Sequence, residues 1–591
     1  MSGPRTRFSC SSWRIAAAVV LLATVGVGCG PGQPGRPATE DQTRSGAPPV
    51  RKTMTIGVLS TVAAYAPWDL GNPTGGSAVL AEMHMASLVS QDVQGNREAR
   101  LAARVPSLDD GTLSLLPDGG MRTTWALRPN VLWHDGTSFT AEDLVFSSQV
   151  MRNPQIPLGG GALGTIMRQI DSVQAADAHT LVITWRTPFY RALDLGTRDF
   201  WPFPKHLLGE AFQGDIQAFT ALPYFTTEYV HLGPFRLAEF HEGELQVFRR
   251  FDQYFLGTPR LDSIVVRTVR DPNALLANLK AHAVDIASEQ TLTSDLFIDL
   301  RDEWQQTGEG TVLARQYTWR YLQVQMDPQY SRPVELSQDV RIRRALLRAI
   351  DRDALRAFLY PGFAGSGADT FILDTDPRMA IVGQPFAQYS YDARTALQEL
   401  AESGWNRGTD GRLLNQEGRP VQIDVRGSVV DSKGVALVAD YWRRIGIEAA
   451  ENISPPALAR DPERQSTFTG VDMTARGSGE SMLPNFDGRL LAGPENRWSG
   501  QNKQHYANPA LDRIIDAIYG TVDDAARGEL LRQAGVILAS DLPGLPTHFT
   551  MGFVALSRGV RALTDDFATT GWPGSGPQGL MSRNAHLWDR D

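Results

Sequence analysis

The segment Thr124–Phe146 constrains the fold of this 591-residue chain more than any other stretch. Residues 124–127 alternate between small and large apolar side chains, which is typical of a half-buried strand. Pro129 interrupts the alternation, and Val131–Trp133 resumes it. Asp135–Gly136 then predicts a tight turn.

A helix is expected directly after this turn. Thr140 stands where an N-cap residue should be, and Asp143 places a carboxylate in the first turn, near the free amides. Leu144, Val145 and Val150 follow at helical spacing. The whole segment therefore predicts a strand, a turn and a helix, which any α/β protein can contain.

The remaining chain shows the same mixture of elements. With 42% hydrophobic and 21% charged residues, its composition is that of a large globular protein, and its length predicts several domains. Strands are expected at 181–185, 245–248, 264–268 and 421–425. The clearest helices are expected at 274–279, 342–350, 393–403, 435–445 and 527–538. This mixture predicts an α/β or α+β architecture.

Longer motifs give the chain a resemblance to a known family. Residues 124–146 are similar to its signature of an aromatic-x-Leu-Arg strand, a turn and Thr-Ala-x-Asp at a helix start. Further similar segments are Gly233–Leu237, Arg249–Phe255, Leu276–Ala287, Asp339–Asp351, Tyr391–Trp405 and Tyr506–Asp512. From about Met54 onward the chain is identified by this resemblance as a member of family 5 of the extracellular solute-binding proteins. These are the oligopeptide, dipeptide and nickel receptors of ABC importers.

The resemblance implies an α/β, two-lobed periplasmic-binding-protein fold of class II, cluster C type, with an extra subdomain in the first lobe. It places lobe I at residues 51–315, including the subdomain at about 97–190. Lobe II is expected at 316–544, and a C-terminal return to lobe I at 545–591. The lobes of such a protein close on the ligand through a hinge, so ligand contacts are expected from both lobes.

The amino terminus has the pattern of a secretory leader. Three arginines precede the short apolar run Ile15–Val27, which ends just before Cys29. We expect a lipoprotein signal peptide at residues 1–28 and acylation of Cys29; the alternative is an ordinary leader with a chance cysteine. The only other cysteine, Cys10, lies in the leader, so the mature chain can form no internal disulfide.

Residues 29–50 are rich in Gly, Pro, Ser, Thr and Gln, which predicts a flexible tether between membrane and domain. The formal charge is −9, and removal of the three leader arginines, with no leader acids, makes it about −12. This balance argues against nucleic acid as a partner. The expected protein is a monomer outside the cytoplasm, held to the cell membrane by lipid.

No catalytic motif is evident. The ten histidines form no short metal-ligand spacing, and neither a G-x-S-x-G elbow nor a P-loop occurs. Gly159–Gly164 matches G-x-G-x-x-G, but it follows Pro154 and Pro157 rather than a strand, so a loop is favoured over dinucleotide binding. His134 is interpreted as structural. We therefore expect no enzyme activity, no cofactor and no metal site.

Candidate ligand contacts come from regions that line the cleft in the family. In the first lobe and at the crossover they are Asn72, Gly75, Ser77, Ser288 and Glu289. At the entry to the second lobe and within it they are Tyr317, Trp319, Arg320, Lys433, Arg464 and Glu480. Each has a plainer interpretation, because glycines serve turns, aromatics fill cores and basic residues lie on surfaces. Lys433 and Arg464 could otherwise receive a ligand carboxylate.

Glu480 is the candidate partner of a ligand ammonium. In peptide-binding family members an Asp after an aromatic residue pairs with the peptide α-ammonium. The corresponding stretch here, Arg476–Pro484, has no Asp, and Glu480 is its one carboxylate, although Ser481 could occupy the family position instead. If Glu480 has this role, Glu480→Gln should weaken a peptide with a free amino terminus by roughly 2–5 kcal/mol.

The resemblance implies a receptor that delivers a small peptide or similar solute to an ABC permease and its ATPase. Within that class, the solute could instead be an opine, an oligosaccharide or a metal chelate. A module of the same fold that senses ligand or acts as a chaperone, without transport, is the alternative from another class. Loss of uptake on deletion would separate transport from sensing.

Overall fold

The computed structural model describes residues 51–68, 76–92, 96–156, 158, 162–197, 199–363, 368–458, 461–561, 563 and 581–591. The predicted leader, the tether and Cys29 lie outside the described residues, as do Asn72 and Gly75. Residues 51–591 form one compact unit. No helix in the described part of the chain is both long and apolar enough to cross a membrane.

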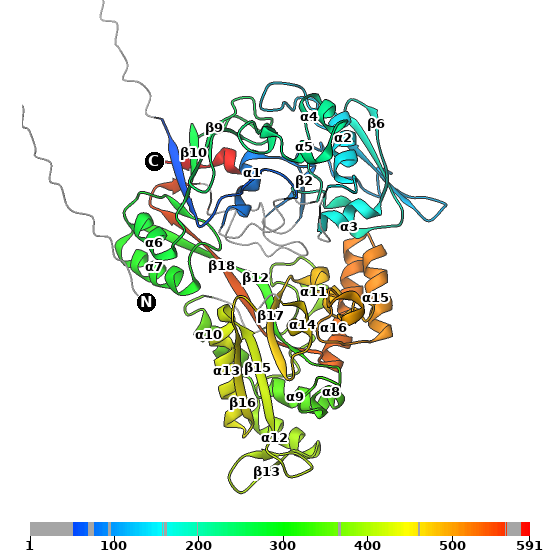
Figure 1. The fold of residues 1–591 in the computed structure, drawn as a ribbon, viewed down its shortest axis with the longest axis vertical. Coiled ribbons are helices and arrows are strands. Elements are labelled where there is room, and N and C mark those ends of the chain that lie inside the picture. The colour runs from blue at the N-terminus through cyan, green and yellow to red at the C-terminus, as the bar shows by residue number, and fades with distance from the viewer. Residues whose placement is uncertain are drawn as a thin grey trace, which may run out of the picture. The chain divides into compact units, whose positions relative to one another are not determined.

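A ten-stranded mixed sheet is the main element of this unit (Figure 1). Its strands, in spatial order, are β16 (Glu448–Ser454), β15 (Gln422–Ser428), β17 (Val471–Arg476), β12 (Gly310–Val324), β18 (Gly544–Ser557), β11 (Ile286–Ala287), β1 (Thr53–Val58), β10 (Ser263–Thr268), β9 (Leu245–Arg250) and β8 (Phe235–His241). The strand order shows that residues 286–324 and 544–557 connect two groups of strands.

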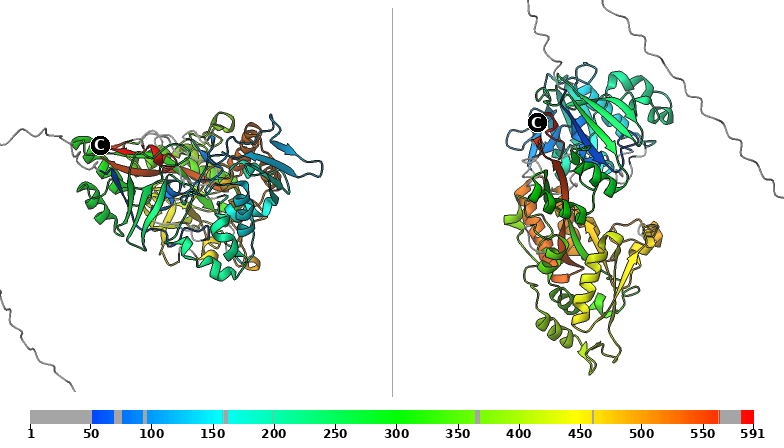
Figure 2. Two further views of the ribbon diagram at one scale, coloured as in Figure 1. Left: turned by 90° about the horizontal axis from the view of Figure 1, so that it is seen from above. Right: turned by 90° about the vertical axis from the view of Figure 1, so that its left-hand side faces the viewer.

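The two longest strands, β12 and β18, form the middle of this sheet. They pair antiparallel from Gly310 opposite Ser557 to Gln323 opposite Gly544. The register shifts between Gln316 and Trp319. Figure 2 shows β18 running from one group of elements to the other. The predicted boundary between the lobes at residue 316 falls inside β12, and the division of the chain into lobes stays a prediction.

Smaller sheets complete the strand set. A four-stranded sheet has the order β4 (Leu113–Leu115), β5 (Met121–Ala126), β7 (Thr180–Trp185) and β6 (Ile170–Asp177). The two-stranded sheets pair β2 (Val89–Gln91) with β3 (Arg97–Ala99), β13 (Asn406–Arg407) with β14 (Leu413–Leu414), and β19 (Val560–Arg561) with β20 (Asp589–Arg590). The four-stranded sheet lies within the region predicted as the extra subdomain.

Sixteen α-helices occur in the described part of the chain. Those preceding β12 are α1 (Ala81–His84), α2 (Ala141–Met151), α3 (Ala162–Gln169), α4 (Lys205–Phe212), α5 (Ile216–Thr220), α6 (Pro272–Lys280) and α7 (Ser294–Thr307). Those following it are α8 (Glu335–Gln338), α9 (Val340–Arg348), α10 (Arg352–Leu359), α11 (Met379–Val382), α12 (Ala393–Glu402), α13 (Ser432–Arg444), α14 (Pro462–Ser466), α15 (Pro509–Gly520) and α16 (Asp524–Asp541).

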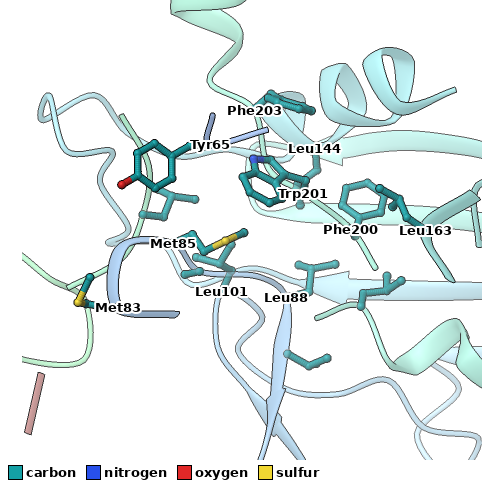
Figure 3. Packing of buried hydrophobic residues seen from close by; sticks show 14 of the residues in the cluster. Tyr65, Met83, Met85, Leu88, Leu101, Leu144, Leu163, Phe200, Trp201 and Phe203 are labelled. Atoms are coloured by element: carbon teal, nitrogen blue, oxygen red, sulfur yellow. The ribbon is translucent and has the colours of Figure 1, made fainter. Parts of the chain in front are cut away.

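Apolar side chains gather in two large cores. The first contains residues from 54 to 266 together with the end of β18 and the C-terminus, and the aromatic and methionine packing around Trp201 in Figure 3 is part of it. The second contains residues from 319 to 549. A smaller cluster lies around α6 and α7. The two large cores coincide with the two groups of strands, so each group has its own interior.

The segment Thr124–Phe146 follows its sequence pattern with one exception. In β5, Trp125 is buried and its neighbours are partly exposed, and at the start of α2 Thr140 and Asp143 form a reciprocal capping box. The expected continuation of the strand through Val131–Trp133 is wrong. Only an isolated bridge between Leu132 and Ser138 forms there, because Pro129 has no amide hydrogen to donate to a ladder.

The other predicted strands and helices are present, whereas the loop predicted at Gly159–Gly164 is wrong from Ala162 onward, where α3 begins. The four predicted strands correspond to β7, β9, β10 and β15, and the five predicted helices to α6, α9, α12, α13 and α16. Their ends differ from the predicted ones by a few residues. The combination of a mixed sheet with helices confirms the α/β composition of the fold.

Three histidines lie inside the first core. His84, His134 and His231 are each at most 7% exposed. His134 donates from Nε2 to the carbonyl oxygen of Gly233 (2.9 Å) and accepts at Nδ1 from the amide of His231 (3.2 Å). Burial lowers the pKa of His84 to about 3 and that of His134 to about 4, and it lowers the pKa of His231 as well. All three are therefore neutral in the folded protein near neutral pH.

The free energy of unfolding should depend on pH through His84. Its folded pKa lies below the unfolded value of 6.5, so its contribution is complete above pH 6.5 and is lost as pH falls toward about 3. Urea unfolding at pH 6.0, 5.0 and 4.5 measures the slope of the free energy of unfolding against pH. His84→Gln should reduce this slope by up to about 1.4 kcal/mol per pH unit.

The exposed His241 provides the matched control, because His241→Gln removes an imidazole that is not packed in the core. Burial raises the pKa of Glu82 to about 7, which gives the free energy of unfolding a pH dependence of opposite sign. Because this contribution is the same in the wild type and in both variants, it cancels when their slopes are compared. An equal slope for wild type and His84→Gln would contradict the prediction.

Candidate functional site

Two predicted first-lobe segments meet at the end of β11. Ser288 is fully buried, and its Oγ donates to the carbonyl oxygen of Gly76 at 2.9 Å. Gly76 has a φ of +90°, and a Cβ at that position would lie 2.3 Å from the Ser288 Oγ. This close approach requires glycine. Next to it, Ser77 has a buried Oγ without a hydrogen-bond partner in the described chain.

Glu289 is engaged within the protein. Its two carboxylate oxygens accept bidentate hydrogen bonds from Arg315 Nε (2.8 Å) and Nη2 (3.0 Å), and both side chains are almost fully buried. Gly552 on β18 packs against the pair, because a Cβ there would lie 2.8 Å from Glu289 Oε1. This arrangement neutralises Glu289 where the chain passes between the two groups of strands. Its role as a ligand contact stays a prediction.

The aromatic residues of β12 lie in the second core. Trp319 stacks on Tyr321 with 4.3 Å between ring centroids, and Phe486 packs beside both rings. The Trp319 Nε1 and Tyr321 hydroxyl groups are buried without a hydrogen-bond partner among the described residues. Both side chains therefore belong to the hydrophobic core, which is the plainer of the two interpretations given for them. Tyr317 lies within β12, and its side chain is outside the described part.

Arg320 and Arg464 line one cavity of about 250 Å³. Because β15 runs parallel to both β16 and β17, the carboxyl ends of these strands lie together. Ser428, Ser454 and Arg476, the last residues of the three strands, all line the cavity. In open α/β sheets, ligands bind outside the carboxyl ends of parallel strands. The structure thus brings two predicted residues together at a place suited to a ligand.

The cavity contains more positive than negative charge. Its basic residues are Arg320, Arg426, Arg464, Arg476 and Lys503, and its acidic residues are Asp431 and Asp472. Asp472 forms a bidentate pair with Arg426, with both distances 2.9 Å. Asp431 pairs with Arg320 and also accepts a hydrogen bond from the Ser428 amide at 3.1 Å. Both acids of the cavity are therefore already paired.

The other three basic residues have no carboxylate partner among the described residues. Arg476 donates from Nε to the amide oxygen of Asn485 at 2.6 Å, which leaves its charge uncompensated. Burial lowers the pKa of Lys503, and the nearby charge of Arg476 lowers it further. The Nε of Arg464 is buried without a hydrogen-bond partner in this part of the chain. An anion would satisfy these groups.

Lys433 does not line this cavity. It is exposed at the beginning of α13, where its Nζ lies 2.7 Å from both carboxylate oxygens of Asp295 at the beginning of α7. An exposed pair of this kind contributes little to stability. Because α7 belongs to the small cluster and α13 to the second core, the pair does connect two parts of the fold.

Glu480 lies at the centre of a buried ionic network. It is 2% exposed and lies in a 3-10 helix, η5 (Gly479–Asn485). Arg378 contacts both carboxylate oxygens, with Nη2 at 3.1 Å from Oε2, and Arg527 donates from Nε to Oε1 at 2.7 Å. Burial raises the pKa of Glu480, but the charges and hydrogen bonds of the two arginines outweigh it and hold the pKa at about 2.

The network continues toward the first core. Arg527 pairs with Asp524, whose Oδ2 lies 3.0 Å from Nη1 of Arg97, and Arg97 Nε lies 2.7 Å from Asp194. Arg527 also lies over the ring of Tyr190, 5.3 Å from its centroid. Positive and negative groups alternate from Glu480 to Asp194. Glu480 is thus part of a continuous ion-pair chain, and its role as an ammonium partner stays a prediction.

Sequence reasoning missed most of the charged groups of this site. Asp472 and Arg476 could have been recognised, because residues 471–476 alternate between apolar and polar side chains, and residues four apart share a face of a strand. Arg378 and Arg527 could not, since they are 102 and 47 residues from Glu480 along the chain. Within the described residues, no group of three or more His, Cys, Asp or Glu side chains is placed to hold a metal ion.

Comparison with known proteins gives a family match. The sequence model described as bacterial extracellular solute-binding proteins, family 5 Middle, matches residues 116–487. The oligopeptide-binding protein AppA of Bacillus subtilis (strain 168) is 23% identical over 398 residues, which cover 64% of this chain and 65% of AppA. Protein XP55 of Streptomyces lividans is 25% identical over 557 residues, 92% of this chain and 91% of its own. The match thus spans slightly less than two thirds of AppA's length.

A solved structure shows the same fold. NikA from Brucella suis, crystallised in complex with Fe(III)-EDTA, superposes with a TM-score of 0.70 at 18% sequence identity. The superposition covers 91% of this chain and 100% of NikA. At this identity the likeness concerns the fold alone. It confirms the predicted two-lobed α/β fold.

Glu480 should be essential to stability in the absence of any solute. Glu480→Gln leaves Arg378 and Arg527 buried with one neutral partner in place of a carboxylate. Breaking a buried ion pair in this way costs roughly 3–5 kcal/mol. Urea unfolding followed by tryptophan fluorescence measures the loss.

Glu529→Gln is the matched control, because Glu529 lies on α16, the helix of Arg527, and pairs with Arg532 at the exposed surface. Its unfolding midpoint should equal that of wild type. If Glu480→Gln also unfolds like wild type, the ion-pair chain does not stabilise the fold.

Proposed function

The chain belongs to family 5 of the bacterial extracellular solute-binding proteins, and on that basis we propose that it captures a small solute outside the cytoplasm and delivers it to an ABC permease. The protein itself performs no chemistry in this proposal. The ATPase of the transporter supplies the energy, and the receptor contributes recognition and closure. Its expected partners are the solute, the permease complex and, through a lipid, the membrane.

The observation that carries the proposal is the arrangement of two separate cores joined mainly by β12 and β18. Two lobes connected by a few strands can rotate relative to each other as rigid bodies. Candidate contacts lie at the crossover, where Ser288 meets Gly76, and in the second lobe, where Arg320 and Arg464 line the cavity. A ligand between them would be contacted from both lobes.

A peptide is the first candidate solute, because AppA is named as an oligopeptide-binding protein. The proposed contact residues are Asn72, Gly75, Ser77, Ser288, Glu289, Tyr317, Trp319, Arg320, Lys433, Arg464 and Glu480. Of these, Glu289 and Glu480 could receive a peptide ammonium only by giving up or sharing their arginine partners.

A non-peptide solute is the second candidate, and the arginine partners of Glu480 favour it. Two guanidinium groups already neutralise the carboxylate that a peptide ammonium would need. NikA, which shares the fold, was crystallised with Fe(III)-EDTA, a polycarboxylate chelate. A solute without an ammonium group would leave the ion-pair chain of Glu480 intact.

Closure should be visible in solution. Protein purified under native conditions would retain its solute, whereas protein unfolded, dialysed and refolded would lack it. Small-angle scattering should give a larger radius of gyration for the refolded protein. The smaller value should return when the small-molecule fraction released from the native protein is added back, because the lobes close around it. Equal radii in all three samples would contradict closure.

Anchoring by lipid should depend on Cys29. One acyl chain binds membranes only marginally, but two or three give stable attachment. Cys29→Ser should therefore appear in the soluble fraction, while the wild type sediments with membranes. Cys10→Ser, which alters the leader and leaves Cys29 in place, is the control and should partition like wild type. Identical partitioning of wild type and Cys29→Ser would rule out the lipoprotein assignment.

A further inference from the structure

The turn between α15 and α16 packs against the first core, although both helices belong to the second. α15 is anchored in the second core by Leu511, Ile515 and Ile518. Tyr519, near the end of α15, packs against both cores, and Val522 in the turn packs against the first. In Figure 1, α15 lies to the right of β12 and β18, so this contact is separate from the strands that join the two groups.

An aromatic stack forms the centre of this second contact. Tyr190 of the 3-10 helix η2 (Tyr190–Leu193) is buried in the first core. Its ring stacks on Tyr519, with 5.6 Å between the ring centroids and 13° between the ring planes. The guanidinium group of Arg527 lies over the same Tyr190 ring, 5.3 Å from its centroid. Two side chains of the second group therefore contact one ring of the first.

Arg527 holds the turn in the shape that makes this contact. Its Nη1 donates to the carbonyl oxygens of Thr521 and Val522, both at 3.0 Å. Its Nε donates to Glu480 at 2.7 Å, and its Nη2 donates to Asp524. Because a guanidinium group is planar and its donors have fixed directions, these bonds fix the turn relative to Glu480. The turn is thus ordered by residues of its own group.

An ion pair at the edge of the contact crosses between the two groups. Arg97 of β3 lies with Nη1 3.0 Å from Oδ2 of Asp524, and its Nε lies 2.7 Å from Asp194. The Asp524 side chain is 53% exposed, so dissolved salt screens this pair. The Glu480–Arg527 pair is buried and is screened much less. The contact therefore has an apolar centre and a salt-sensitive edge.

A contact of this kind can separate without unfolding either core. One aromatic pair and one half-exposed ion pair each contribute modestly to stability, and small interfaces within a chain permit relative motion. While the contact is made, the two groups are attached at two separate places, here and at β12 and β18. Bodies attached at two places rotate only about the line that joins them. Separation of the contact releases the other rotations.

We propose that the α15–α16 corner, residues 519–527, is a reversible docking contact that restricts the lobes to one axis of rotation before any solute binds. In the docked state the lobes are aligned for closure. In the undocked state they are not, so the apparent affinity for a solute falls in proportion to the docked fraction. The docking contact does not depend on the identity of the solute or on transport.

Distance measurements between the lobes test this proposal. Leu115 on β4 and Val536 on α16 are exposed and can be replaced by spin-labelled cysteine. In the full-length chain with Cys10→Ser and Cys29→Ser, the two labels are the only thiols. Protein that has been unfolded, dialysed and refolded is free of solute. Pulsed electron paramagnetic resonance should then give one main distance population for the unaltered corner.

Three substitutions should separate the lobes by different amounts. Tyr519→Ala removes the stack and should raise the ratio of undocked to docked molecules by about tenfold. Asp524→Asn removes the ion pair with Arg97 and should raise the ratio by about two- to fivefold. The double variant should show a second, displaced population. Arg532→Gln is the matched control, because Arg532 is on α16 and pairs with the exposed Glu529, and it should leave the distances unchanged.

Salt provides an independent arm of the test. About 1 M NaCl should raise the undocked population of the unaltered corner as Asp524→Asn does, and it should add little to that variant. Circular dichroism melts check that each variant is folded. If Tyr519→Ala does not fold, Asp524→Asn and the salt response decide the question.

Two results would overturn the proposal. One is a double variant, or Asp524→Asn where Tyr519→Ala does not fold, with the same distance distribution as the unaltered corner. The other is an equal change in Arg532→Gln, which would show that the corner has no special role. All measurements are made without solute, so they are independent of the proposed function. A failure of solute-induced closure would leave the docking contact intact, and loss of the docking contact would leave solute capture to be tested by scattering.

Discussion

The pairing of β12 with β18 is the interaction on which the rest of the fold depends. Their ladder extends from Gly310 to Gln323 on one strand and from Gly544 to Ser557 on the other. β17 joins this pair on one side and β11 on the other, so both lobes are built on the same two strands. The buried Glu289–Arg315 pair lies against β18 at the crossover, which fixes the path of the chain between the lobes.

Local sequence patterns predicted the elements that depend on near neighbours. The capping box of Thr140 and Asp143 formed because both partners lie within one helical turn. By contrast, β12 and β18 were not predicted. Their partners are more than 200 residues apart, β18 is buried over most of its length, and β12 is mostly half-buried before its buried end at residues 321–324, so no clean alternation marks either strand. Resemblance to the family supplied the two-lobed arrangement that periodicity could not.

The candidate site, too, could be predicted only in part from the sequence. Arg320 and Arg464 could be named from their position in the family pattern, and the structure places both in one cavity. The environment of Glu480 could not be predicted, because a carboxylate in a sequence does not reveal which distant arginines will surround it. Arg378 and Arg527 come from separate elements and give Glu480 an internal partner on each side. Electrostatic compensation is a property of the assembled fold.

The register shift in β12 has a mechanical consequence. A strand of this length extends about 50 Å, and its regular ladder from Gly310 to Gln316 extends roughly 20 Å before two register shifts, one between Gln316 and Trp319 and one between Arg320 and Tyr321. A ladder bends more easily where its register is irregular than where it is regular, so bending of β12 is concentrated at the shifts. A rotation of about 10° there moves the far end of this 20 Å segment by about 3–4 Å. Small torsional changes at the register shifts thereby produce displacements as large as the length of a hydrogen bond.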